Sequence, residues 1–277
     1  MAAALAAVAT TAMRSLQQPL SLLVRHRRLI FRTVQTEVRQ KYAGSILGSV
    51  WYFLLPALLL AAYVLLYLLI LRVKPAGLTP AVYIVYLFSG LIPYLGISEG
   101  LAAGVNALVT NRSLLKTTVF PPELIPVRAV LASQMSFAAG MVVMLTLATF
   151  VGLGSASWIL LLPIVLLQML LLFGLAWILS LLNLLVRDIS HAIMFALTVM
   201  LLLSPVTFVV DGMQGSTKLI VWMNPLTYFV HSYQSIVVHG RLPQWPVLAV
   251  LTTLSLGIFY LGFIAFSRLK TQFADHA

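Results

Sequence analysis

Six long apolar stretches fill most of this chain, and they constrain its fold more than any other feature. We place them at residues 51–71, 82–105, 129–151, 158–186, 189–210 and 246–267. Each can cross a hydrocarbon core of roughly 30 Å as a helix, which satisfies its own backbone hydrogen bonds. Only 8% of the residues are charged, whereas a soluble domain usually carries about 25%. The sequence therefore predicts an all-α membrane protein with six spans, in a single domain over residues 1–277.

Basic residues gather on one side of these stretches. If the chain begins in the cytoplasm, thirteen of its seventeen Lys and Arg residues are cytoplasmic. The four on the other side are Arg72, Lys74, Lys218 and Arg241. Because cytoplasmic loops of membrane proteins collect Lys and Arg, both termini are predicted to be cytoplasmic. The same rule accounts for the net charge of +11 without nucleic acid as a partner.

Several kinds of chemistry are excluded or disfavoured. There are no cysteines, which excludes disulfides and thiolate metal sites, and the five histidines lack metal-ligand spacing, so no metal site is predicted. The spans hold almost none of the acidic residues that mark proton or sodium pathways. No phosphate-binding loop of the form GxxxxGKS/T is present. We therefore expect no cofactor on this chain, and ATP with Mg²⁺ on a partner chain if transport is ATP-driven.

Residues 20–42 predict an amphipathic helix. Six apolar residues share one broad face, while four arginines lie elsewhere: Leu22, Leu23, Leu29, Ile30, Val34 and Val38, against Arg25, Arg28, Arg32 and Arg39. A basic amphipathic helix favours the cytoplasmic membrane surface. A solvated leader that only sets topology is the alternative. Gly44 and Gly48 then permit a tight bend before the first span.

Few charged residues stand at or inside the first two spans. Arg39 and Lys41 precede the first span at headgroup depth, where cations can hold the phosphates of a lipid-linked substrate. Generic binding to anionic lipid is the alternative. Glu99 is the one acid well inside a span, and a buried carboxylate there needs a partner. It lies near a membrane boundary instead if the second span breaks at Pro93 or Gly96.

Residues 211–245 do not fit a simple alternation of spans and loops. They contain two apolar pieces, 219–223 and 226–238, which are each too short to span and are separated by Asn224 and Pro225. We predict an external re-entrant hairpin of two short helices. Such a hairpin survives at membrane depth only where protein or a water-filled cavity covers its backbone.

Tyrosines recur along the first two spans. Those that we select as candidates to line a substrate conduit are Tyr52, Tyr63, Tyr67, Tyr86 and Tyr94. Sugars pack their C–H faces on aromatic rings, so an uncharged glycan would suit such a lining. Helix contacts and interface belts also use Tyr, which leaves packing as the alternative. Tyr63 and Tyr67 share one helix face at a spacing of four residues.

Four motifs, taken in order, resemble one transporter family. The motifs are EVRQKYAGSILGSVWYFLLP (37–56), YLFSGLIPY (86–94) with the loop LLKTTVFPPELIPVR (114–128), RDI (187–189) and WMNPLTYFV (222–230). Together they resemble ABC-2 type export permeases, and within these the exporters of O-antigen, capsule and teichoic acid. The resemblance covers roughly residues 30–270. It is less specific for the glycan than for the family.

This resemblance implies partners and a docking element. Residues 110–123 would form a coupling helix that fits a nucleotide-binding ATPase subunit. Its contact residues would be Asn111, Leu115, Lys116, Phe120 and Glu123. The permease would be a homodimer with two ATPase copies, with its conduit between the two halves. An ordinary loop whose basic residues set orientation is the alternative.

The predicted function is the permease subunit of an ATP-driven exporter of lipid-linked polysaccharide, with O-antigen preferred, in a bacterial inner membrane. An ABC-2 exporter of a drug or small lipid is the first alternative. The second is a membrane-embedded lipid-sugar enzyme, which usually presents a catalytic acid or histidine at the membrane surface.

Overall fold

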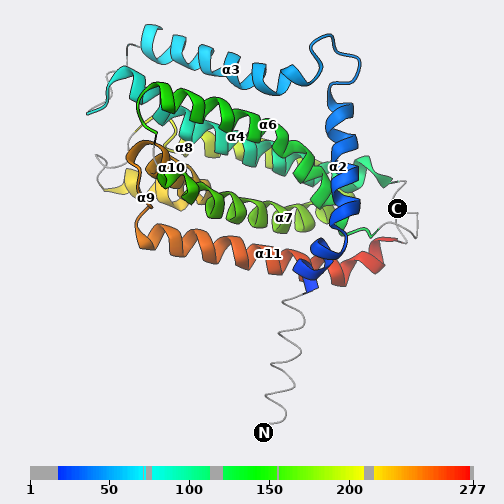
Figure 1. Cartoon of the computed structure of the whole chain (residues 1–277). Coiled ribbons are helices and arrows are strands. Elements are labelled where there is room, and N and C mark those ends of the chain that lie inside the picture. Colours follow the sequence, from blue (N-terminus) through cyan, green and yellow to red (C-terminus); the bar gives the residue numbers. More distant parts are fainter. Residues whose placement is uncertain are drawn as a thin grey trace.

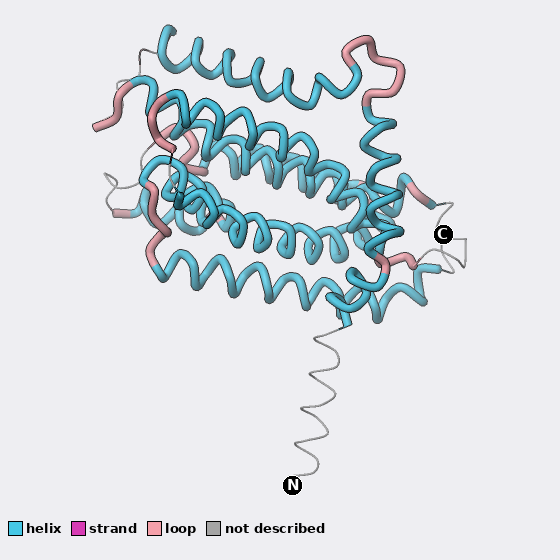
Figure 2. The backbone as a smooth tube through the Cα atoms, viewed as in Figure 1, coloured by secondary structure: helices cyan, strands magenta, loops and turns pink. Residues whose placement is uncertain are grey.

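The computed structural model describes residues 18–70, 72, 77–112, 121–154, 156–208 and 215–274, and the described residues form helices and loops without a strand (Figure 2). The α-helices are α2 (Arg27–Lys41), α3 (Trp51–Val64), α4 (Pro80–Thr110), α6 (Leu124–Phe150), α7 (Leu161–Leu185), α8 (Asp188–Leu203), α9 (Ser216–Met223), α10 (Pro225–His239) and α11 (Trp245–Ala274). A π-helical segment, Leu65–Ile70, extends α3, and a 3-10 turn, Ala156–Leu160, precedes α7.

Five helical segments are long and apolar enough to cross a membrane. They are Gly48–Tyr67, Pro80–Thr110, Leu124–Phe150, Ala156–Leu185 and Trp245–Lys270. The fifth predicted span, 189–210, corresponds to α8, which is apolar but has only 16 residues. At 1.5 Å per residue α8 is roughly 24 Å long. An all-helical, multi-pass membrane architecture thus emerges, and the sixth span stays a prediction.

The long helices form a layered bundle. Figure 1 shows α3, α6, α4, α7 and α11 running side by side in that order, and α2 crossing one end of the bundle. The C-terminal end of α11 lies at the same end as α2. The short helices α9 and α10 lie at the opposite end.

The centre of this bundle is tightly packed. In α4, 19 of the 31 residues are buried, and the helix continues through Pro93 and Gly96 without a break. Helices α7 and α11 approach so closely that a Cβ atom on Gly174 would collide with the backbone of Ile258. A Cβ atom on Gly262 would in turn collide with the backbone of Gly174. These two glycines therefore set the distance between the helices.

The segment between α8 and α11 turns back into the protein. Asn224 separates α9 from α10, and its side-chain oxygen accepts from the backbone N–H of Leu226 at 3.0 Å. Its amide also donates to the Met200 carbonyl at 2.9 Å. Helix α10 is largely buried against α4, α7 and α11. Protein thus covers α10, whereas α9 buries only Val221, and the predicted position of the pair at the outer membrane face stays a prediction.

Helix α2 and the helical residues 18–25 before it keep the predicted apolar and basic residues apart. All six residues of the predicted apolar face are buried or half-buried, and the four arginines named with them are exposed. The chain then turns through Gly44 and Gly48, whose φ angles of 83° and 50° favour glycine. The predicted bend is present, and it brings the end of α2 beside α3, α4 and α6.

Candidate functional site

A cavity of about 370 Å³ opens where the end of α2 meets α3, α4 and α6. Its lining residues are Lys41, Tyr42, Trp51, Tyr52, Leu55, Pro56, Leu59, Ile92, Leu95, Gly96, Glu99, Ser136 and Phe137. We call it the Lys41 cavity. Its lining comes from three stretches that are far apart in sequence, residues 41–59, 92–99 and 136–137, which makes it the candidate functional site.

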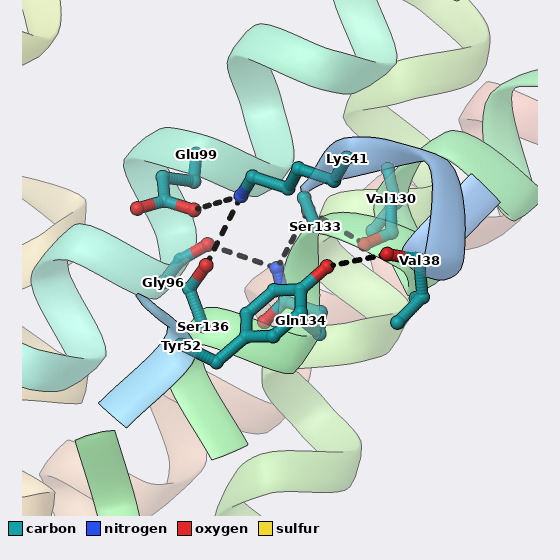
Figure 3. A network of polar contacts seen from close by, with 9 residues as sticks. All are labelled: Val38, Lys41, Tyr52, Gly96, Glu99, Val130, Ser133, Gln134 and Ser136. Atoms are coloured by element: carbon teal, nitrogen blue, oxygen red, sulfur yellow. Dashed lines mark hydrogen bonds and ion pairs between the residues drawn. The ribbon is translucent and has the colours of Figure 1, made fainter. Parts of the chain in front are cut away.

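The Lys41 ammonium group is the centre of its polar end (Figure 3). The nitrogen lies 3.6 Å from a carboxylate oxygen of Glu99 and donates a hydrogen bond to Ser136 Oγ at 3.1 Å. The side chains of Lys41 and Glu99 are 40% and 46% exposed. An ion pair with such exposure contributes at most about 1 kcal/mol to stability, because water solvates both partners nearly as well.

Two tyrosine rings complete the surroundings of this ammonium group. Their centroids lie 5.7 Å (Tyr42) and 5.5 Å (Tyr52) from the Lys41 nitrogen, within the range of cation–π attraction. The rings meet edge to face, with centroids 4.7 Å apart. Burial, and secondarily the negative charge of Glu99, raises the pKa of Tyr42 above its usual value of 10.0. Tyr42 therefore stays neutral at physiological pH and offers a hydroxyl group and an aromatic face.

Hydrogen bonds hold the walls of the cavity in place. The Tyr52 hydroxyl donates to the carbonyl of Val38 at 3.0 Å, which ties α3 to α2. The Gln134 amide donates to the carbonyl of Gly96 at 2.9 Å, which ties α6 to α4. Figure 3 shows both bonds beside Lys41. The polar end is thus supported by contacts that leave the ammonium group itself half-exposed.

The rest of the cavity is apolar. From Trp51 to Leu59 the wall follows α3 over nine residues, and the first and last lie roughly 12 Å apart along the helix axis. Ile92 and Phe137 face the same space from α4 and α6. A cation with aromatic rings at one end and hydrocarbon along the other suits an amphiphile whose headgroup is anionic.

The structure brings some of the predicted site residues together and separates others. Lys41 and Tyr52 both line the cavity, whereas Arg39 is exposed and does not line it. Positions two apart on a helix point in different directions, which explains the separation of the two cations. Glu99, whose surroundings the sequence left open, is the partner of Lys41. Sequence reasoning missed Ser136, because a lone serine in an apolar helix carries no signal of its own.

The other predicted conduit tyrosines lie away from this cavity. Tyr63, near the end of α3, stacks on Tyr67 of the following π-helical segment with ring centroids 5.8 Å apart. Tyr86 and Tyr94 are buried, and their hydroxyl groups donate to the carbonyls of Phe208 and Leu197. Within one copy of the chain, these two rings therefore pack helices together. A sugar-lining role for the four tyrosines stays a prediction.

The described ends of the predicted coupling segment are fixed by polar contacts. Arg128 on α6 donates to Asn111 at the end of α4 and lies 3.9 Å from the Glu37 carboxylate on α2. Leu115, Lys116 and Phe120 lie outside the described residues, so their predicted ATPase contacts stay predictions.

Glu123 is held inside the protein at the other end of this segment. Its carboxylate, 6% exposed, is 2.5 Å from the Lys270 nitrogen, and its carbonyl accepts from the Trp177 indole at 2.8 Å. In this arrangement the carboxylate faces α11 rather than a docking surface. Its predicted contact with an ATPase stays a prediction.

Comparison with known proteins points to membrane transport. Residues 28–238 match the protein family described as ABC-2 type transporter. The chain is 28% identical over 256 residues to the O-antigen export system permease protein RfbA of Myxococcus xanthus, covering 91% of this chain and 96% of that protein. It is 25% identical over 241 residues to the protein of the same name from Klebsiella pneumoniae, covering 86% and 91%.

Proposed function

This chain belongs to the ABC-2 type transporter family, and we propose that it is the transmembrane subunit of an ATP-driven exporter of lipid-linked polysaccharide. O-antigen is the preferred glycan. The observation that carries the proposal is the similarity to O-antigen export permeases over nearly the full length of both chains. The resemblance seen in the sequence motifs is confirmed at the level of the family.

The energy for export would come from a partner. An ABC-2 permease implies an ATP-binding subunit, and we propose two copies of a separate ATPase that carry ATP and Mg²⁺. They would dock at residues 110–123 of a permease homodimer. The homodimer would lie in the bacterial inner membrane with both termini in the cytoplasm, as the positive-inside rule favours.

The Lys41 cavity supports a lipid-linked substrate. Lys41 would bind a phosphate of the lipid carrier, with Arg39 contributing from the exposed face of α2. The rings of Tyr42 and Tyr52 would pack against the first sugar, and the apolar wall along α3 would receive the start of the lipid chain. The glycan would then follow the conduit between the two permease copies, where the remaining tyrosines would contact it.

Co-purification and export in the intact cell test this proposal. The chain would be tagged, co-expressed with the ATPase encoded beside it and purified, while surface glycan is measured in the cell. We expect the ATPase to co-purify, and its Walker-lysine variant to leave glycan on the inner leaflet. If the chain purifies alone and its deletion leaves surface glycan unchanged, the proposal is wrong and a small-lipid exporter becomes the better candidate.

A further inference from the structure

Glu99 holds Lys41 only loosely, although no other carboxylate is found among the described residues that line the cavity. A separation of 3.6 Å exceeds a direct N–H···O hydrogen bond. Lysine has three N–H donors, and the Lys41 ammonium group contacts Glu99, Ser136 and two aromatic faces. The ammonium group can therefore exchange its carboxylate partner without leaving Ser136 or the two rings.

We propose that Glu99 is a built-in competitor for Lys41, displaced by the phosphate of an incoming lipid-linked sugar. The identity of the lipid rests on the function proposed above. The role of Glu99 is a separate claim, since it follows from the ion pair and the cavity around it. Glu99 then sets how tightly the headgroup is held.

A phosphate is the anion that this site suits best. It carries more charge than a carboxylate and offers more acceptor oxygens, so it forms the stronger charge-assisted hydrogen bond with an ammonium group. The half-exposed position of Lys41 and Glu99 lets such a group reach the nitrogen from the cavity. The tyrosine rings beside it provide a packing face for the adjacent sugar.

A competitor is useful because an exporter must also release its headgroup. When phosphate leaves, the Glu99 carboxylate returns to Lys41, so the cation regains a counter-charge. Without that carboxylate, departure of the phosphate would leave the ammonium group with no anionic partner in the cavity. We therefore expect Glu99→Gln to bind the headgroup more tightly and to export it more slowly.

The test measures headgroup binding to the full chain, with its ATPase, in nanodiscs of zwitterionic phosphatidylcholine. The probe is a fluorescent polyprenyl diphosphate linked to one N-acetylglucosamine, and inorganic pyrophosphate is a second arm. We expect Glu99→Gln to tighten lipid binding about threefold to fivefold, the range that corresponds to a half-exposed ion pair. Lys41→Gln should weaken it at least about tenfold, because a charge-assisted hydrogen bond is lost.

The double variant separates competition from simple repulsion. If Glu99 acts by occupying Lys41, then Glu99→Gln has no effect in the Lys41→Gln background. Arg28→Gln is the matched control, since it removes one cation from the exposed face of the same helix. We expect it to change the dissociation constant less than twofold.

Distinct outcomes would overturn distinct claims. Equal tightening by Glu99→Gln in both backgrounds, or no tightening in either, overturns the competition between Glu99 and phosphate and leaves the proposed function standing. Inorganic pyrophosphate binding as tightly as the lipid overturns the assignment to a lipid headgroup. Wild-type protein that binds neither probe overturns both the inference and the proposed substrate.

Discussion

Helices α3 and α4 are both apolar enough to span a membrane, but their surroundings differ. In α4, 19 of the 31 residues are buried, whereas in α3 only Tyr52 and Pro56 are. Two ion pairs also differ. The buried Glu123 carboxylate lies 2.5 Å from the half-exposed Lys270 of α11, whereas Lys41 and Glu99 of α4 are both half-exposed and lie 3.6 Å apart. We infer that the Lys270–Glu123 pair stabilises the fold, whereas the Lys41–Glu99 pair can exchange its carboxylate for another anion.

The largest effect is expected where α7 and α11 touch. Gly262→Ala should destabilise the protein by about 3 kcal/mol or more, because the added methyl group meets backbone that cannot move aside. Gly257→Ala on the same helix is the control, since its Cβ would have nothing within 4 Å. The measurement is the thermal unfolding midpoint in detergent. Equal losses from both variants would contradict the account of a close-packed core.

Breaking the ion pair between the buried Glu123 and the half-exposed Lys270 should have the next largest effect. Lys270→Met leaves the Glu123 carboxylate inside the protein without its cation, at a cost of about 2 kcal/mol. Arg268→Gln, at an exposed position in the same turn, should change stability by less than about 0.5 kcal/mol. Chemical unfolding of both variants measures this difference. An unfolding midpoint for Lys270→Met equal to that of Arg268→Gln would show that the Lys270–Glu123 pair does not stabilise the fold.

The bend between α2 and α3 should respond more weakly. Gly44→Ala places a side chain at a φ of 83°, which costs about 1 kcal/mol, although there is nothing nearby for the methyl group to strike. Gly44→Asn should cost less, because Asn tolerates this conformation better than Ala. Unfolding midpoints rank the two variants. If Asn proves worse than Ala, backbone conformation is not the reason for glycine there.

The smallest effect on stability is expected at the Lys41 cavity. Lys41→Gln and Glu99→Gln should each change the free energy of unfolding by less than about 1 kcal/mol, since both side chains are half-exposed. The same unfolding assay, read beside surface glycan display, distinguishes stability from function. If either variant lost as much stability as Lys270→Met, the Lys41–Glu99 pair would stabilise the fold as strongly as the Lys270–Glu123 pair, and the proposed difference between the two pairs would be wrong.

The sequence predicted the helices and bends better than the contacts between them. Apolar length and helical spacing were sufficient for the all-helical membrane fold, the faces of α2 and the bend at Gly44 and Gly48, because these are local properties. The partner of Glu99 was not predictable, since Lys41 lies 58 residues earlier and reaches it only after α2 folds back over α4 and α6. Glu123 shows the converse limit, because a glutamate before a proline-rich helix start looks exposed until α11 covers it.

Photo-crosslinking from the Lys41 cavity tests most directly whether the substrate headgroup binds there. p-Benzoylphenylalanine would be placed at Leu55, which lines the Lys41 cavity, or at Phe53, which is exposed on the same helix outside it. Cells with an inactive ATPase partner would accumulate labelled lipid-linked glycan before irradiation. We predict crosslinking from Leu55, little from Phe53, and loss of the Leu55 product on Lys41→Gln. Equal products at both positions, or a Leu55 product unaffected by Lys41→Gln, would contradict a substrate headgroup bound in this cavity.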